Sequence, residues 1–130
     1  MTYLEYNIGE GRTKLHIKVM PMGADLVILV TGGNAHIGSI AVAVPRPSLD
    51  DPNKVSATTS VFNITGHMDD HLSQPLANEI AAETGRKVVV VAGFHLDNIT
   101  PAEIENILKN LESVSTILKQ EVQTIEISDH

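Results

Sequence analysis

The stretch Val88–Ile104, VVVVAGFHLDNITPAEI, joins the most apolar segment of the chain to the start of its clearest helix. Four consecutive valines are typical of a strand that is buried on both faces of a sheet. The apolar run breaks at Gly93, and His95, Asp97 and Asn98 follow before the helix begins. Because ligands commonly bind where buried strands end, this segment predicts either a simple turn or a binding site.

The helix that follows begins with a capping box. Thr100 can cap it, Pro101 suits its first position, and Glu103 can bond back to the cap. Apolar residues then recur three or four positions apart and predict one buried helical face. They are Ile104, Ile107, Leu108, Leu111, Val114, Leu118 and Val122.

A second helix is predicted upstream of the valine strand, within residues 66–85. Its apolar positions recur four apart and share one face. Gly85 suits the left-handed residue that ends many helices. Two starts fit the sequence: Asp69 can be the N-cap, or Ser73 can be the N-cap with Pro75 in the first turn. The apolar positions are Leu72, Leu76 and Ile80.

Four strands are predicted before this helix, because short segments either alternate apolar and polar residues or are rich in β-branched ones. Pro21 and Gly23 predict a type I turn between the first two strands. The four segments are 13–20 (TKLHIKVM), 24–30 (ADLVILV), 37–44 (IGSIAVAV) and 56–65 (SATTSVFNIT).

The resulting order, β-β-β-β-α-β-α, predicts an α+β fold. A chain of 130 residues suits one domain, so we expect a single domain over residues 1–130. The sheet should be mostly antiparallel, with two helices packed on it and one parallel pair from the late β-α-β step. Residues 123–130 predict a flexible acidic tail.

The composition argues against several classes of protein. A net charge of -7 disfavours binding to nucleic acid, which needs a basic face. The absence of cysteine excludes disulfides and thiolate chemistry. No apolar run approaches the roughly 20 residues of a membrane-spanning helix. The N-terminal residues also lack a signal-peptide pattern, so we expect a cytoplasmic protein without a membrane partner.

The glycine-rich segment Thr31–Ser39, TGGNAHIGS, is one candidate site. Gly32, Gly33 and Gly38 permit close approach of a ligand to the backbone, and exposed amides there could bind an anion. The segment matches neither a Walker A loop nor a dinucleotide-binding fingerprint. An ordinary hairpin connection is the alternative.

A pair of histidines, His67 and His71, is the next candidate. They lie four apart, with Asp69 and Asp70 between them, which is a metal-ligand spacing on a helix. The glutamate of an H-E-x-x-H motif is missing. Carboxylates at a helix start also interact favourably with the helix dipole, which is the alternative role.

A glycine and a histidine recur together at three predicted strand ends. If these ends converge, they form one pocket that suits a planar, phosphate-bearing ligand. Arg46 follows another strand and could bind the phosphate. No Ser-His-Asp order, nucleophile elbow or carboxylate pair is present, so we expect no catalytic residues. The three pairs are Gly33/His36, Gly66/His67 and Gly93/His95.

The chain resembles the prenylated-flavin chaperone family, which includes small proteins associated with gallate decarboxylase. The resemblance extends from about Gly11 to Leu118. The blocks that carry it are GGNAHIGSIAVA, RPSL, SATTSVFNITGHMDDHL and VVVVAGFHLDNITPAEIE. It implies a fold like that of proteasome assembly chaperones, which pair as dimers. It also implies a non-catalytic role beside UbiD-type aromatic acid decarboxylases, with prenylated FMN made by a flavin prenyltransferase.

These observations predict a homodimeric accessory protein that binds FMN or prenylated FMN. We expect it to help mature a UbiD-type decarboxylase, with neither catalytic nor metal-binding residues. The predicted cofactor-binding residues are Gly32, Gly33, His36, Ile37, Gly38, Ser39, Arg46, Ser60, Gly66, His67, His71, Gly93, His95 and Asn98.

Two alternatives belong to other classes of protein. One is a small metal-dependent enzyme that uses a histidine cluster. The other is an assembly protein that binds no ligand. Flavin colour and bound metal in the purified protein would distinguish these possibilities. The histidines of the first alternative are His36, His67, His71 and His95.

Overall fold

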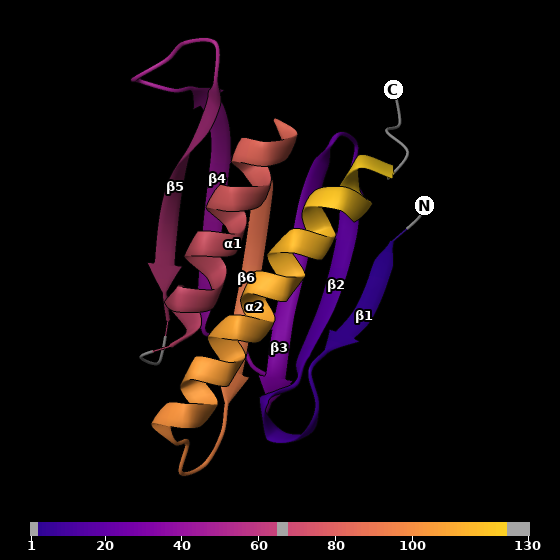
Figure 1. Cartoon of the computed structure of the whole chain (residues 1–130), viewed down its shortest axis with the longest axis vertical. Coiled ribbons are helices and arrows are strands. Elements are labelled where there is room, and N and C mark those ends of the chain that lie inside the picture. The colour runs from indigo at the N-terminus through magenta and orange to yellow at the C-terminus, as the bar shows by residue number, and fades with distance from the viewer. Residues whose placement is uncertain (1–2, 65–67, 125–130) are drawn as a thin grey trace.

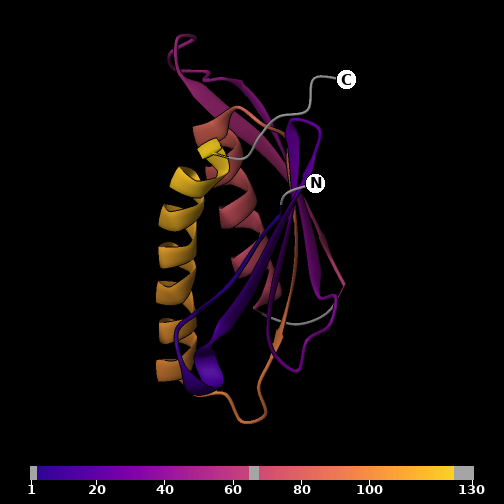
Figure 2. The same ribbon diagram turned by 90° about the vertical axis from the view of Figure 1, so that its right-hand side faces the viewer.

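One six-stranded sheet carries both helices on the same face (Figures 1 and 2). The computed structural model describes residues 3–64 and 68–124. The elements are β1 (Leu4–Ile8), η1 (Gly11–Thr13), β2 (Leu15–Met22), β3 (Asp25–Gly33), β4 (Ser39–Pro47), β5 (Val55–Asn63), α1 (Asp69–Thr84), β6 (Val88–His95), α2 (Pro101–Glu121) and η2 (Val122–Thr124).

The strand order is β1-β2-β3-β6-β4-β5. Strand β6 is parallel to β3 and antiparallel to β4, and every other pair of neighbours is antiparallel. The predicted α+β fold with a mostly antiparallel sheet and one parallel pair is therefore confirmed. Because β6 lies between β3 and β4, residues 34–38 must cross its carboxyl end to connect those two strands.

The core lies between the helices and the sheet. Alternate residues of each strand face the helices, as the period of two requires. On β4 these inward residues are small, namely Ala41 and Ala43, and α1 packs over β4, β5 and β6. Helix α2 packs beside α1 and reaches β1 and β2. The fully buried large side chains are Leu15, Ile17, Val19, Leu26, Ile28, Val30, Leu72, Leu76, Ile80, Val88, Ile107 and Leu118.

The opposite face of the sheet, called the outer face here, has no helix over it in the described residues (Figure 2). Its three central strands present aliphatic side chains along most of the registered part of the sheet, and Thr31 of β3 and Gly93 of β6 follow at the carboxyl end. Val42 is 41% exposed there, in spite of its central position. The outward residues are Val27 and Leu29 of β3, Val89 and Val91 of β6, and Ile40, Val42 and Val44 of β4.

The sequence predicted the caps at three helix ends, and the structure agrees with two of these predictions. Thr100 and Glu103 form the predicted capping box of α2, and Gly85 ends α1 in the left-handed conformation with φ of 69°. The predicted N-caps of α1, Asp69 and Ser73, were wrong. The helix begins at Asp69, directly after Met68, and neither of these two side chains caps it. Because the helix begins before Ser73, Pro75 lies inside it.

Two predictions for the strands were also wrong. Strand β2 continues through Pro21 to Met22, and the turn is the two-residue Gly23-Ala24 link with Gly23 at φ of 61°, so there is no type I turn around Pro21. Strand β1 was not predicted at all.

Of the predicted tail, Gln123 and Thr124 belong to η2 and the remainder lies outside the described residues.

Gly93→Ala tests the crossing of residues 34–38 over β6. A methyl group at Gly93 would collide with the backbone carbonyl of His36. We expect a loss of about 1–3 kcal/mol in the free energy of unfolding, measured by urea denaturation, because the backbone must move to admit the methyl.

Gly23→Ala is the control for this substitution. Its Cβ would meet no atom within 4 Å, and the only cost is the left-handed backbone, about 1 kcal/mol. A Gly93→Ala protein as stable as the wild type would show that residues 34–38 do not lie where the structure has them.

Candidate functional site

Several segments meet at one end of the molecule, the lower end in Figure 1. Because β3 and β6 are parallel, their carboxyl ends lie together, with Gly33 opposite His95. Antiparallel β4 begins at the same end, and so do both helices. The arrangement brings His36 of the crossing segment and His95 of β6 to one place, so two of the three strand ends that carry a glycine and a histidine converge.

The crossing segment is fastened to the end of β6 on both sides. The N–H of Asn34 donates to the carbonyl of His95 at 2.9 Å, and the N–H of Gly38 donates to the carbonyl of Ala92 at 2.9 Å. Between these bonds the backbone of His36 lies directly over Gly93. Gly93 is therefore required for close packing of backbone on backbone.

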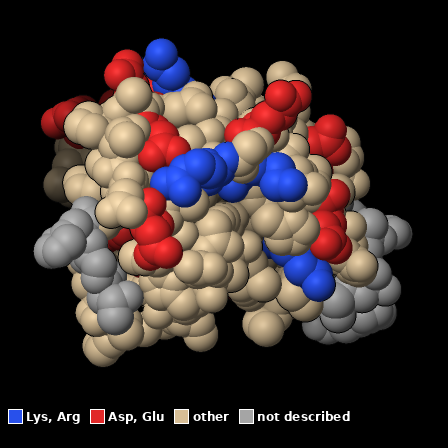
Figure 3. Space-filling model, turned by 90° about the horizontal axis from the view of Figure 1, so that it is seen from below, with Lys and Arg blue, Asp and Glu red and all other residues tan. Residues whose placement is uncertain are grey.

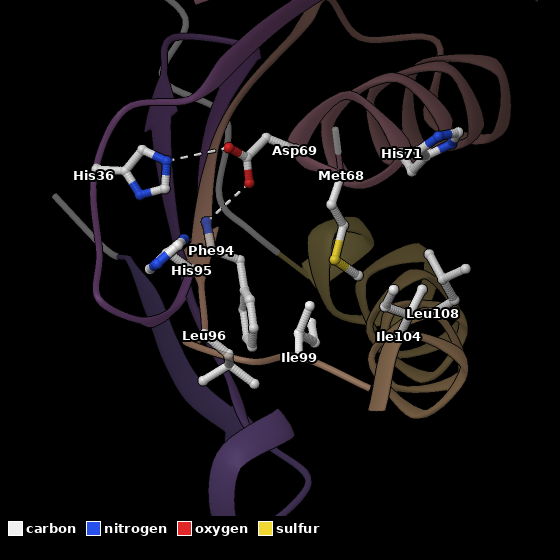
Figure 4. Close-up of a pocket in the computed structure, with 10 residues that line it drawn as sticks. All are labelled: His36, Met68, Asp69, His71, Phe94, His95, Leu96, Ile99, Ile104 and Leu108. Carbon is white, nitrogen blue, oxygen red and sulfur yellow. Dashed lines mark hydrogen bonds and ion pairs between the residues drawn. The ribbon is translucent and has the colours of Figure 1, made fainter. Parts of the chain in front are cut away.

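Asp69 is the polar centre of this end. Its side chain is 2% exposed, yet both of its oxygens have partners. Oδ1 accepts the N–H of Phe94 at 2.9 Å, and Oδ2 lies 3.1 Å from Nε2 of His36 (Figure 4). Buried carboxylates need such partners to offset their loss of hydration. Asp69 thus joins the start of α1 to β6 and to the crossing segment.

His36 is held from both sides of its ring. Its Nδ1 lies 3.1 Å from the carbonyl oxygen of Asn34, and its Nε2 lies against Asp69. Gly38 leaves the space for this contact, because a Cβ there would collide with Asp69. Gly38 therefore contributes by its lack of a side chain.

A cavity of about 630 Å³ opens beside this network, and we call it the main cavity (Figure 4). Its size lies within the usual range of small-molecule sites. One part of the wall is polar and the larger part is apolar. The lining residues are His36, Asp69, His71 and His95, with Met68, Phe94, Leu96, Ile99, Ile104 and Leu108.

The segment after β6 closes the lower side of the main cavity. Nε2 of His95 lies 3.1 Å from Oδ1 of Asp97, so Asp97 orients this ring. Asn98 has a positive φ of 54° and does not line the cavity, so it has the turn role that the sequence left open.

Arg12 fastens the same segment to the rest of the fold. It donates to Oε2 of Glu103 at 2.7 Å and to the carbonyl of Asp97 at 2.8 Å. The hydrogen bond from Arg12, followed by that from the backbone N–H of Thr100, lowers the pKa of the Glu103 carboxyl. The start of α2, the η1 turn and the cavity wall are thereby linked at one point.

The structure brings some of the other predicted residues close to the main cavity. Gly32 and Gly33 lie beside it and line a neighbouring cavity. Ile37 is exposed on the crossing segment. Ser39 is buried and its hydroxyl bonds to that of Ser73 at 2.8 Å, so it is not open to a ligand.

Two predicted residues lie away from the main cavity. Arg46 lies near the opposite end of β4, where it donates to Oγ1 of Thr58 at 2.7 Å and to the carbonyl of Pro47. Ser60 pairs with Val42 from the edge strand β5 and is exposed on the outer face. The predicted Gly66 and His67 lie outside the described residues.

The apolar wall was not predicted as part of a site. Ile104 and Leu108 belong to the apolar stripe of α2, which the sequence predicted to be a buried face, and both are partly exposed at the cavity. Asp69 was expected only as a cap or a dipole partner. One signal could have indicated the role of Asp69 in the site. It is an acidic residue that is not needed as a cap, and it lies next to a histidine-rich segment.

The metal-site alternative finds no support in residues 3–64 and 68–124. They contain no group of three or more histidine, aspartate or glutamate side chains placed to hold a metal ion. Figure 4 shows His71 on the far side of the cavity from His36 and His95. The fold and the main cavity define a small α+β domain suited to binding an apolar ligand with a polar edge.

The chain belongs to the family described as the prenylated flavin chaperone LpdD-like domain, whose model matches residues 9–123. The resemblance found in the sequence is thus confirmed. The chain is also 31% identical over 84 residues to Protein LpdD of Lactiplantibacillus plantarum. That match covers 64% of this chain and 58% of LpdD, so it spans less than two thirds of that protein.

The fold is similar to a solved structure from a chaperone complex for yeast 20S proteasome assembly. The TM-score is 0.60 with 18% sequence identity, over 93% of this chain and 97% of the other. This likeness confirms the predicted fold relationship. The chaperone family indicates a non-catalytic protein. Among the described residues, no helix has the length and apolar character to cross a membrane.

Glu103→Gln should reduce stability in a way that depends on pH. Because the folded state lowers the pKa of Glu103, its contribution is present above the unfolded value, about 4.3, and is lost as the pH falls through the folded value. We expect the substitution to lower Tm at pH 7 and to lower it less at pH 3, measured by circular dichroism. Glu105→Gln, which removes an exposed pair with Lys109 at 3.7 Å, is the control. An equal loss from Glu103→Gln at both pH values would contradict the Arg12 contact.

Proposed function

We propose that this protein is a non-catalytic accessory protein that binds prenylated FMN or FMN in the main cavity. The observation that carries the proposal is the cavity itself, whose broad apolar wall faces a narrow polar edge. An isoalloxazine ring has the same character, with apolar faces and a few hydrogen-bonding groups at one edge. Membership of a prenylated flavin chaperone family supports this ligand over other planar molecules.

Each part of the cavity has a separate role in this proposal. Leu96, Ile99 and Ile104 contact the faces and the prenyl-derived ring of the flavin. His95 donates to its polar edge through Nδ1, since its Nε2 is already bonded to Asp97. Both ring nitrogens of His36 are bonded to Asn34 and Asp69, so its ring packs against the flavin without donating to it. Groups held in place before binding lose little entropy when the ligand arrives.

The proposed role is to pass the cofactor between two enzymes in the cytoplasm. A flavin prenyltransferase would supply prenylated FMN, and a UbiD-type aromatic acid decarboxylase would receive it. Delivery requires release, and a cavity with a small number of polar contacts suits a ligand that must leave again. The family description supports the accessory role, and the two partner enzymes are part of the proposal.

The proposal includes a homodimer formed through the outer face. Seven aliphatic side chains from the three central strands cover that face without a charged residue among them. Apolar surface of this extent on a sheet is usually covered by a partner. The structural relative from the yeast complex is itself part of an assembly, which is consistent with pairing.

Ile104→Glu tests the ligand. Ile104 is 36% exposed at the cavity, so the fold should tolerate the change, while a carboxylate there removes apolar contact and places a charge against the apolar ring of the cofactor. We expect FMN and prenylated FMN to bind at least about tenfold more weakly, a change of about 1.4 kcal/mol, by isothermal titration calorimetry.

Thr116→Glu adds the same charge to α2 away from the cavity and should leave binding unchanged. A wild-type protein that binds neither flavin would favour the ligand-free assembly protein. Stoichiometric zinc or iron in the purified protein would instead favour the metal-dependent enzyme.

Val42→Glu tests the dimer. Its carboxylate would be placed at the centre of the outer face, where pairing would bury it without a partner charge. We expect light scattering to give twice the monomer mass for the wild type and the monomer mass for the variant. Leu49→Glu, on a loop residue that is 89% exposed, is the control and should remain dimeric. A monomeric wild type at micromolar concentration would contradict the proposed pairing.

A further inference from the structure

A second cavity of about 650 Å³ lies next to the main cavity, and we call it the side cavity. It opens at the same end of the sheet, where β2 and β3 meet the η1 turn. Leu96 lines both cavities, so a single side chain forms part of the wall between them. The backbone of Gly33 also lies at this boundary with φ of 58°, directly against the carbonyl of His95.

The side cavity differs in charge from the rest of the chain. The protein carries a net charge of -7, yet among the described residues no carboxylate lines this cavity. Its wall instead includes three basic side chains, Arg12, Lys14 and His16. Figure 3, which views the molecule from this end, shows lysine and arginine side chains gathered beside a hollow, with acidic side chains next to them and at both sides.

Lys14 is the basic residue available to a ligand. Arg12 is bound to Glu103, and His16 lies 2.9 Å from Oδ1 of Asn7 and 3.2 Å from Oε1 of Glu5. Within the described part of the chain, Lys14 forms no ion pair, and its side chain is exposed. An ammonium group without an acidic partner, in a concave wall, favours an anion with several oxygens.

We propose that the side cavity binds the terminal phosphate of the flavin nucleotide whose ring occupies the main cavity. The inference rests on the proposed function and extends it to a second subsite. FMN has an apolar ring joined to its phosphate by a flexible polyol chain, which matches an apolar cavity and a basic one separated by Leu96. Lys14 provides the charge, and the hydroxyl of Thr31 is a donor in the same wall.

This subsite replaces the phosphate partner expected from the sequence. Arg46 is bonded to Thr58 near the opposite end of β4, away from both cavities. The alternating pattern of residues 13–20 placed Lys14 only on the polar face of a strand. In this proposal the outer face of the sheet next to the start of β2 binds the phosphate and is not only exposed to solvent.

The test compares FMN with riboflavin, which has the same ring and chain but no phosphate. We expect wild-type protein to bind FMN about tenfold or more tightly than riboflavin, the effect of a charge-assisted hydrogen bond, in titrations at low salt. Lys14→Ala should bring FMN binding down to the riboflavin level and leave riboflavin binding unchanged.

Lys18→Ala is the matched control. Lys18 lies farther along the same alternating segment, with its ammonium 5.0 Å from the ring of Tyr3, and it does not line the side cavity. Lys18→Ala removes the same charge as Lys14→Ala but outside the side cavity. The Lys18→Ala protein should therefore keep the preference for FMN over riboflavin. If Lys18→Ala abolished the preference for FMN over riboflavin as fully as Lys14→Ala, the subsite would be overturned, and the preference would reflect the overall charge of the protein.

Two further outcomes separate this inference from the proposed function. Equal binding of FMN and riboflavin to the wild type would overturn the phosphate subsite while the flavin site stands. Binding of neither flavin would remove the proposed function, and the wild type is then titrated with inorganic phosphate and followed by amide chemical shifts. Saturable shifts at Lys14, Thr31 and Gly33 would support an anion site there, and their absence at a large excess of phosphate would overturn it.

Discussion

The insertion of β6 between β3 and β4 is the constraint on which the rest of the site depends. It prevents a hairpin between β3 and β4 and forces residues 34–38 across the end of β6. The crossing places His36 over Gly93, where only a glycine leaves room for the second backbone. It also brings three strand ends and two helix starts to one end of the molecule, so that a cavity forms where the core ends.

Asp69 converts this crossing into a fixed site. A carboxylate that is 2% exposed would be costly without partners, and here the N–H of Phe94 and the ring of His36 both satisfy it. One residue thereby holds α1, β6 and the crossing segment in register. The histidine at the polar edge of the cavity is therefore positioned before any ligand arrives, and the apolar wall opposite it needs no such support.

Much of the fold could be predicted from local patterns, whereas the site could be predicted only in part. The capping box at Thr100 and the valine strand are local signals that tertiary packing did not override, and the pairing of glycine with histidine located His36 and His95. Strand order is not local, so the sequence could not place Arg46 at the end of the sheet away from the cavity. Helical periodicity also cannot distinguish a core residue from a cavity residue, which is why Ile104 was predicted only as part of a buried helical face.

The outer face and the side cavity share a strand, and this gives pairing and binding a physical connection. Strand β3 presents Val27 and Leu29 to the outer face and Thr31 to the side cavity, two residues farther along the same face. Where a second copy packs on the outer face and a phosphate occupies the side cavity, both partners contact the same strand. Thermodynamic linkage is reciprocal, so a flavin that strengthens pairing must itself be bound more tightly by the dimer by the same factor. Release of the cofactor would then be favoured by any partner that competes for the outer face, which is a direct route from assembly to delivery.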